Sequence, residues 1–311
     1  MELSQTSGTE YRAIFNNPGH LYNSADFNSL TGEARQMPVV YLGFKTGKFK
    51  LGIIGSDADG IFRSPFSAPF GGFACKDEAV DLADIEAATD LLTGYCRNKG
   101  LSAIELILPP VFYTPNFNSK VANVLYRKGF IPFASDLNYS LHLQTMQGYL
   151  ESLAYNAKKN LHIALAKPFR FERCGNAASE ETAYSVIRRN REERGFPLRM
   201  TMEAVRRTMR VAPADFFLLS LEDEPVAAAL VFYVADGIVQ VIYWGDLPAH
   251  AANKCMNYLA YRLVDYYLEK GMRVIDVGPS TEKSTPNYGL CRFKESIGCS
   301  IYSKTSWRLT L

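Results

Sequence analysis

The segment that most constrains the fold is a short apolar run, residues 272–277, which ends at Gly278 and Pro279. Its β-branched content and abrupt end are typical of a strand that is buried on both faces. Just before it, apolar residues recur at helical spacing over residues 256–267, and Gly271 stands where a left-handed helix C-cap belongs. The pattern therefore predicts a helix that leads into a buried strand.

Three strand-like runs precede this helix and strand, at residues 216–221, 226–233 and 238–244. Asp236-Gly237 separates the last two, and Asp-Gly between apolar runs is the strongest short hairpin signal. The order is an antiparallel meander, a helix, and a strand that returns parallel to the meander through a right-handed crossover. Ligands favour the carboxyl ends of such parallel strands, here residues 243–246 and 276–280.

The first half of the chain repeats this order of elements. Its expected elements are strands at 39–44 and 50–54, an Asp-Gly turn at 58–61, a helical stripe from 85 to 96, a buried strand at 103–108, a helix at 121–128 and a closing strand at 138–143. The repeat predicts a duplicated unit. We place the boundary in the polar stretch 144–151, which gives domains 1–145 and 146–311. One amphipathic helix is expected over residues 149–166.

Bulk properties exclude several classes of protein. A chain of 311 residues with 47% hydrophobic residues can bury two cores. Its polar N-terminus and the lack of a long apolar run argue against secretion and against a membrane span, so a cytoplasmic location is expected. The six cysteines form no CxxC pair, so no metal site is expected. A net charge of +2 does not argue for nucleic acid, and DNA is not an expected partner.

The order of elements resembles the GNAT acyltransferase fold. Residues 276–280, Asp-Val-Gly-Pro-Ser, followed by Asn287, Gly289-Leu290, Arg292-Phe293-Lys294 and Gly298, resemble the signature of FemAB-like transferases. The resemblance implies an α/β (α+β) fold of two GNAT-like halves, each a mixed, mainly antiparallel sheet with flanking helices and a parallel strand splay. The active site would lie in the C-terminal half.

The same resemblance implies a function. FemAB-like enzymes move an amino acid from aminoacyl-tRNA onto an amine of a peptidoglycan precursor, with no tightly bound cofactor and no metal. We therefore expect transfer of an aminoacyl or acyl group to a small-molecule or peptide amine, with tRNA as a possible partner. One alternative is a coenzyme-A-dependent N-acyltransferase. A second is a pseudoenzyme that binds a ligand without catalysis.

Three residues are candidates for the chemistry of acyl transfer, which needs an aligned carbonyl and donors where the oxyanion forms. By resemblance, Lys294 supplies charge to the leaving group or oxyanion, with a solvated basic helix face as the alternative. Tyr243, at a strand end, is a candidate proton donor to the leaving group, or a core aromatic. Asp276 follows an apolar run and therefore needs a partner. It is a general base, an anchor for the acceptor amine or part of a structural ion pair.

Further residues are candidates for binding substrate. They are Trp244, Ser280, Asn287, Arg292, Arg194, Asn190 and Phe70. Ser280 and Asn287 flank a polar loop, and Arg194 begins an Arg-Gly loop that adds to the resemblance. Phe70 lies in a Pro- and Gly-rich segment, residues 64–72, similar to a family segment that faces the cleft between halves.

Two stretches bear on the acyl donor. The arginine-rich residues 188–210 could attract the phosphates of tRNA or of a nucleotide sugar, although interleaved glutamates favour ordinary helical charge pairs. Residues 245–253 lack the repeated glycines whose amides would cradle the pyrophosphate of coenzyme A. The donor is therefore expected to be aminoacyl-tRNA or, less in keeping with this loop, acyl-coenzyme A.

Overall fold

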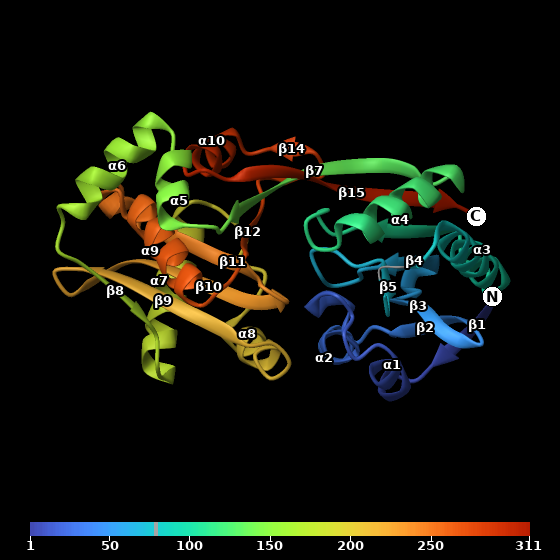
Figure 1. The fold of residues 1–311 in the computed structure, drawn as a ribbon. Coiled ribbons are helices and arrows are strands. Elements are labelled where there is room, and N and C mark those ends of the chain that lie inside the picture. Colours follow the sequence, from blue (N-terminus) through green and yellow to red (C-terminus); the bar gives the residue numbers. More distant parts are fainter. Residues whose placement is uncertain (78–79) are drawn as a thin grey trace. The chain divides into compact units, whose positions relative to one another are not determined.

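The computed structural model describes residues 1–77 and 80–311 (Figure 1). The chain forms two compact units: unit 1 comprises Met1–Leu137, Lys283–Thr285 and Tyr302–Leu311, and unit 2 comprises Asn138–Glu282 and Pro286–Ile301. This division differs in three places from the expected domains 1–145 and 146–311, one of which is that Lys283–Thr285 belongs to unit 1. In the other two, residues 138–145 belong to unit 2, and Tyr302–Leu311 belongs to unit 1.

Unit 1 contains the first strands and helices of the chain. Its strands are β1 (Glu2–Thr6), β2 (Val40–Thr46), β3 (Lys48–Gly55), β4 (Ile61–Ser64), β5 (Phe73–Cys75) and β6 (Ala103–Ile107). Its helices are α1 (Gly8–Ile14), α2 (Ala25–Arg35), α3 (Leu82–Asn98) and α4 (Pro115–Arg127), with 3-10 turns η1 (Leu21–Asn23) and η2 (Ala58–Gly60). Two long strands, β7 (Ile131–His142) and β15 (Ser300–Thr310), have residues in both units.

In unit 1, an antiparallel sheet of order β1-β2-β3-β5 lies beside a second group of strands in which β4 pairs parallel to β6 and β6 pairs antiparallel to β15. The apolar faces of α3 and α4 form one core with these strands. Leu92 of α3 and Val124 of α4 are fully buried in it, as are Leu42 and Ile104 of the strands. The helical stripe expected around residues 85–96 is confirmed as the buried face of α3.

Unit 2 carries the meander and the crossover. Its strands are β8 (Phe169–Arg173), β9 (Ala214–Leu221), β10 (Glu224–Ala235), β11 (Ile238–Asp246), β12 (Val274–Pro279) and the short β13 (Thr281–Glu282). The short β14 (Thr285–Pro286) has one residue in each unit. Its helices are α5 (Met146–Ser152), α6 (Tyr155–Leu165), α7 (Ala177–Glu193), α8 (Met202–Thr208), η3 (Pro248–Asn253), α9 (Cys255–Glu269) and α10 (Tyr288–Ser296). As predicted, β12 pairs parallel to β11 after the α9 crossover. None of the helices in the described residues has the length and apolar character needed to cross a bilayer.

The two units repeat one strand order. In unit 1 the order β4-β6-β15 is parallel and then antiparallel, and in unit 2 the order β11-β12-β7 is the same. The strand expected at 138–143 therefore exists, but its expected place as the closing strand of the first half was wrong. Residues 138–142 of β7 close the sheet of unit 2 on β12, and residues 306–310 of β15 take the corresponding place on β6. Alternation of apolar residues marks a strand as half-buried without identifying its neighbour.

The single helix expected over residues 149–166 is also wrong, because the chain breaks there into α5 and α6. Leu153 has the extended backbone of a residue outside a helix, with ψ 134°. The Ala154 amide then donates to the carbonyl of Ser296, at 2.9 Å, instead of continuing the helix. A tertiary hydrogen bond has thus replaced a helical one at a position where the apolar spacing runs on unbroken.

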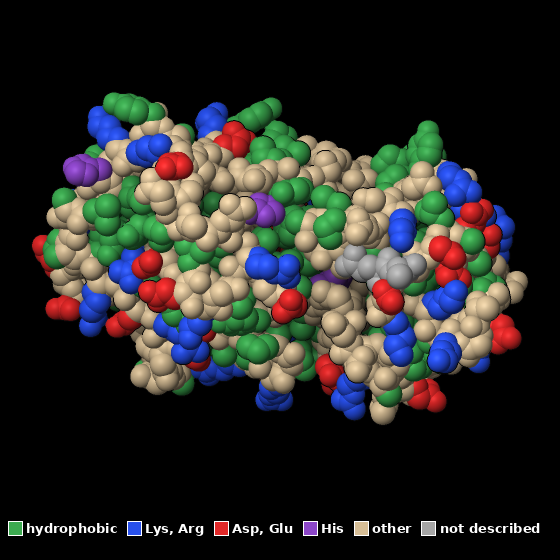
Figure 2. Space-filling view, viewed as in Figure 1, with side chains coloured by type: hydrophobic (Ala, Val, Ile, Leu, Met, Phe, Trp, Pro, Cys, Tyr) green, Lys and Arg blue, Asp and Glu red, His purple; other side chains and the backbone are tan. Residues whose placement is uncertain are grey.

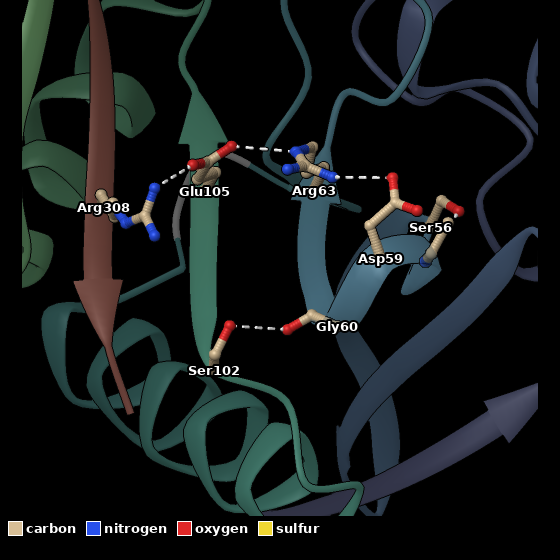
Figure 3. Close-up of polar contacts among 8 residues, drawn as sticks. Ser56, Asp59, Gly60, Arg63, Ser102, Glu105 and Arg308 are labelled. Carbon is tan, nitrogen blue, oxygen red and sulfur yellow. Dashed lines mark hydrogen bonds and ion pairs between the residues drawn. The ribbon is translucent and has the colours of Figure 1, made fainter.

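A partly buried carboxylate joins the three strands β4, β6 and β15 of unit 1 (Figure 3). Glu105 of β6 accepts hydrogen bonds from Arg63 Nε at 3.0 Å and from Arg308 Nη1 at 2.7 Å. Its side chain is only 18% exposed. Asp59 also approaches Arg63, at 3.8 Å, but is 84% exposed. Glu105 is therefore the group that holds both arginines across the sheet.

We expect Glu105→Gln to lower the free energy of unfolding by about 1–2 kcal/mol, because two arginines lose a shared and partly desolvated carboxylate. Asp59→Asn is the matched control and should change stability by less than about 0.5 kcal/mol, since an exposed ion pair contributes little. Urea unfolding of both variants measures the difference. Equal effects of the two substitutions would contradict this account.

Candidate active site

The two parallel strands of unit 2 separate partway along their length. Their pairing runs from Ile238 opposite Val274 to Gln240 opposite Asp276. Beyond this point β11 remains paired with β10, and β12 remains paired with β7 as far as Pro279. The parallel strand splay expected in the C-terminal half is therefore present. We call the opening between residues 241–246 and 277–279 the fork.

Asp276 lies at the base of the fork and is fully buried. Its carboxylate accepts hydrogen bonds from Asn138 Nδ2 at 2.7 Å, Gln240 Nε2 at 2.6 Å and the Gly278 amide at 2.9 Å. An ionised carboxylate only accepts hydrogen bonds, so three donors suit it. These contacts join β7, β11 and β12, which makes Asp276 a residue that positions the fork.

Lys294 lies on α10 and is 2% exposed. Its ammonium donates to three consecutive carbonyls of β12, at 3.0 Å to Val277, 2.9 Å to Gly278 and 3.1 Å to Pro279. Gly278 has φ 75°, a conformation that favours glycine and lets these carbonyls turn toward one nitrogen. Burial lowers the pKa of Lys294 to about 8, opposed by the charges of Cys299 and Asp276. All three donors of the ammonium are therefore used to hold the end of β12.

Tyr243 lies on the diverging part of β11 and is buried. Its hydroxyl accepts hydrogen bonds from the backbone amides of Arg199 and Met200, both at 3.1 Å. Two incoming donors occupy both lone pairs of the oxygen, so the hydroxyl can still give a proton but cannot take one. No residue in the described part of the chain accepts that proton.

Trp244 and Tyr243 are adjacent on the strand, so their side chains point to opposite faces of the sheet. The Trp244 ring packs edge-on against Phe293 of α10, with centroids 6.0 Å apart. Tyr243 instead faces the guanidinium of Arg191 on α7, 5.1 Å from the ring centroid. The fork is thus flanked by α10 on one face and by α7 on the other.

Asn190 and Arg194 fasten the C-terminal end of α7 to β11. Asn190 Nδ2 donates to the Asp246 carbonyl at 2.6 Å, and Arg194 Nη2 donates to the Asp246 carboxylate at 2.9 Å. Burial raises the pKa of Asp246, and the charge of Arg194 opposes this shift. A Cβ atom on Gly245 would stand 2.4 Å from the Asn190 side chain, so this close approach requires glycine. The structure brings both predicted binding residues to the rim of the fork.

Three further predicted binding residues lie along the segment that follows β12. Ser280 is 4% exposed, and its hydroxyl has no partner among the described residues. Asn287 is the N-cap of α10, where its Oδ1 accepts from the Leu290 amide at 3.0 Å. Arg292 is exposed on the same helix. Their roles in binding substrate stay predictions.

Phe70 lies in unit 1 and is fully buried. Its ring packs against His20 and Tyr22, both at 5.0 Å between centroids, and against Tyr113 at 4.8 Å. Burial lowers the pKa of His20 to about 3, so this cluster is neutral and aromatic. A direct contact between Phe70 and substrate stays a prediction.

Five arginines of the arginine-rich stretch form ion pairs with carboxylates. The pairs are Arg188 with Glu192, Arg189 with Glu193, Arg194 with Asp246, Arg199 with Glu282 and Arg206 with Glu181. Figure 2 shows the same mixing of basic and acidic side chains over the face it draws. The interpretation as helical charge pairing, which the sequence favoured over a phosphate-binding patch, holds for Arg188 and Arg189, whose glutamates lie one turn further along α7. The other three arginines pair with carboxylates of other elements.

Sequence reasoning overlooked the partners of Asp276. Gln240 interrupts the apolar run of β11 and is 3% exposed, so a polar residue at a buried strand position was available as a signal. Asn138, 1% exposed, begins the part of β7 that pairs with β12, and nothing local in the sequence indicated that pairing. In residues 1–77 and 80–311, no group of three or more His, Cys, Asp or Glu side chains could hold a metal ion.

The sequence matches no protein-family model and no curated protein. In structure the chain is similar to FemX, with a TM-score of 0.73 at 14% identity, covering 100% of this chain and 98% of that one. It is also similar to the C-terminal domain of a putative lysylphosphatidylglycerol synthetase from Agrobacterium fabrum (TM-score 0.61, 10% identity, 97% and 92% covered). A tandem GNAT protein from the clavulanic acid biosynthesis pathway gives 0.51 at 10% identity, with 99% and 98% covered. The fold is therefore a FemAB-like doubled GNAT fold, as predicted.

The lowered pKa of Lys294 makes stability depend on pH in a defined direction. Between pH 8 and 10.5 the unfolded chain keeps a proton that the folded protein has lost, so unfolding binds a proton and stability rises with pH. We expect the stability of wild type relative to Lys294→Met to increase by about 3 kcal/mol across this range.

Urea unfolding at several pH values measures this difference. The exposed Lys167→Met is the control, and its difference from wild type should be flat over the same range. A flat difference for Lys294→Met as well would show that the ammonium stays charged in the folded protein.

Proposed function

We propose that this protein transfers an aminoacyl or acyl group to an amine, and that unit 2 carries out the reaction. The observation that carries the proposal is the fork. Two parallel strands part at Gln240 and Asp276, with buried polar residues holding both edges. Proteins of similar fold include FemX and a tandem GNAT protein from the clavulanic acid biosynthesis pathway, and both names belong to transferase families.

The reaction joins the nitrogen of an amine to an acyl carbon and releases the group that the acyl carbon carried. The attacking amine must be neutral, and the carbonyl oxygen becomes negative as the tetrahedral intermediate forms. Where a parallel ladder stops, amides of the strand edge lose their strand partner and become available to an oxyanion. We propose that the edge of residues 241–246 supplies these donors.

Tyr243 is the residue we propose as proton donor to the leaving oxygen or sulfur. The Arg199 and Met200 amides fix its hydroxyl and leave only its proton available. A general acid at the reacting centre contributes a rate factor of about 10²–10⁴. Collapse of the intermediate breaks the bond between the acyl carbon and the leaving group, which takes the Tyr243 proton. The proton lost by the attacking nitrogen then restores the hydroxyl through solvent.

Lys294 and Asp276 act as positioning residues in this proposal. Lys294 directs its three hydrogen bonds at β12 carbonyls, so it adds positive charge beside the fork while shaping it. Asp276 is enclosed by three donors of its own protein. Neither side chain has to touch the reacting atoms, because each supports the reaction by holding the strands of the fork in place.

For the substrates we propose the FemAB-like pair: an aminoacyl donor, such as aminoacyl-tRNA, and a peptide amine of the peptidoglycan-precursor type. The segment after β11, residues 247–253, contains no glycine, and Gly245 is packed against Asn190. These features give the pyrophosphate of coenzyme A no glycine-rich cradle at that turn. An acyl-coenzyme A donor is the alternative.

A donor and acceptor screen tests the proposal. Aminoacyl-tRNA and acyl-coenzyme A are each supplied with amino acid, peptide and peptidoglycan-precursor amines, and the amide product is detected by mass spectrometry. We expect product with an aminoacyl donor. Product only with acyl-coenzyme A would correct the donor, and binding without product from any pair would favour the pseudoenzyme.

Tyr243→Phe should lower kcat about 10²-fold or more with the donor and acceptor found in that screen, because the proton donor is lost. Tyr184→Phe is the matched control. Its hydroxyl donates to the Met200 carbonyl at 2.9 Å, so it supports the same loop without lying on the fork.

Single-turnover rates compare the two variants, and thermal melts check that both fold. Unchanged turnover in Tyr243→Phe would remove Tyr243 from the chemistry. An equal loss in both variants would mean that only the position of the loop matters.

A further inference from the structure

One arginine of the basic stretch differs from its neighbours. Five arginines between residues 188 and 206 each have a carboxylate partner, whereas Arg191 has none among the residues that the structure describes. Its Nε is buried and has no hydrogen-bond partner there either. The guanidinium is also more enclosed than those of its neighbours, since Arg188 and Arg189 are more than half exposed.

Two aromatic rings set the place of Arg191. Its guanidinium carbon lies 5.1 Å from the ring centroid of Tyr243 and 5.8 Å from that of Phe196. Such contacts stabilise a cation by about 0.5–1 kcal/mol at exposed sites, which is less than the cost of desolvating an unpaired charge. Burial accordingly lowers the pKa of Arg191. Folding alone therefore does not account for a charged group at this position.

Among the described residues around the fork, one positively charged side chain has no carboxylate partner. Asp276 and Lys294 are of opposite sign, and Arg194 pairs with Asp246. Arg191 is the remaining cation, and it contributes to lowering the pKa of Lys294, so the two positive groups sense one another. An added anion would relieve both the repulsion and the desolvation.

We propose that Arg191 binds an oxyanion of a substrate, a carboxylate or a phosphate group, beside Tyr243 at the fork. The role of this site, but not anion binding itself, rests on the proposed function: an anion held there would orient a substrate toward the diverging strands. A guanidinium presents paired N–H donors that match both kinds of oxyanion, and the two rings hold its plane. Arg191 is partly exposed, so a ligand can reach it from solvent.

Thermal unfolding with simple anions tests the site without any need for turnover. Sodium phosphate and sodium acetate, the two probes, are each compared with sodium chloride at equal ionic strength. We expect one of them to raise the Tm of wild type saturably, by about 3–6 °C at ten times its dissociation constant. A shift with phosphate identifies a phosphate group as the ligand, and a shift with acetate identifies a carboxylate.

Arg191→Met should lose this shift, and Arg191→Lys should keep less than half of it, because lysine retains the charge but not the paired donors. Arg189→Met is the matched control on the same helix and should behave as wild type. In chloride, Arg191→Met should melt within a few degrees of wild type or above it, since it removes an unpaired charge.

The same anion shift in Arg191→Met as in wild type would overturn the site, as would no saturable shift with either anion in wild type. A large fall in the Tm of Arg191→Met in chloride would also overturn it, because the guanidinium would then support the fold. These outcomes are independent of catalysis. An anion shift without any product in the donor screen would sink the proposed transferase and leave the binding site standing.

Discussion

The fork depends on a buried lysine that replaces missing strand pairing. When β11 and β12 part after Asp276, the β12 carbonyls from Val277 onward lose a parallel neighbour. A buried carbonyl without a donor is destabilising by about 1–3 kcal/mol, so an unsupported opening of this length would close or unfold. Lys294 donates hydrogen bonds to three of these carbonyls at 2.9–3.1 Å. The Asp276 carboxylate accepts a hydrogen bond from the Gly278 amide. These hydrogen bonds therefore stabilise the fork without another strand between β11 and β12.

The choice of lysine follows from donor geometry. Three consecutive carbonyls that turn toward one point need three donors on one atom, and among side chains only the ammonium supplies them. The consequence is a desolvated charge, which is seen in the lowered pKa of Lys294. Replacing such a group by an apolar side chain often gains stability in other proteins. Here the same replacement would leave the carbonyls at the end of β12 without donors. The shape of the fork therefore requires the buried charge.

Much of this arrangement could be predicted from local patterns, and the rest could not, for a physical reason. The apolar run of β12, the Asp-Gly turn before β11 and the glycine after α9 identified the strand order, and hence where the fork would lie. Asp276 was recognisable as a carboxylate at the end of an apolar run. Its donors Asn138 and Gln240, and the exchange of β7 and β15, depend on which segments meet in space, and a pattern within one segment contains no such information. Arg191 looks like its neighbours in sequence and differs only in what surrounds it.

The comparison of the two units explains why the fork belongs to one of them. In unit 1 the parallel pairing of β4 and β6 continues to Ser64 opposite Leu106, the last residue of β4. The chain then returns, and the amide of Gly71 donates to the Ile107 carbonyl at 2.8 Å, so the backbone itself fills the place where the strands would open. The Ser64 hydroxyl secures this return by accepting from the Gly72 amide at 3.0 Å. The same strand order thus has two outcomes: backbone closes the edge in unit 1, and a lysine keeps it open in unit 2.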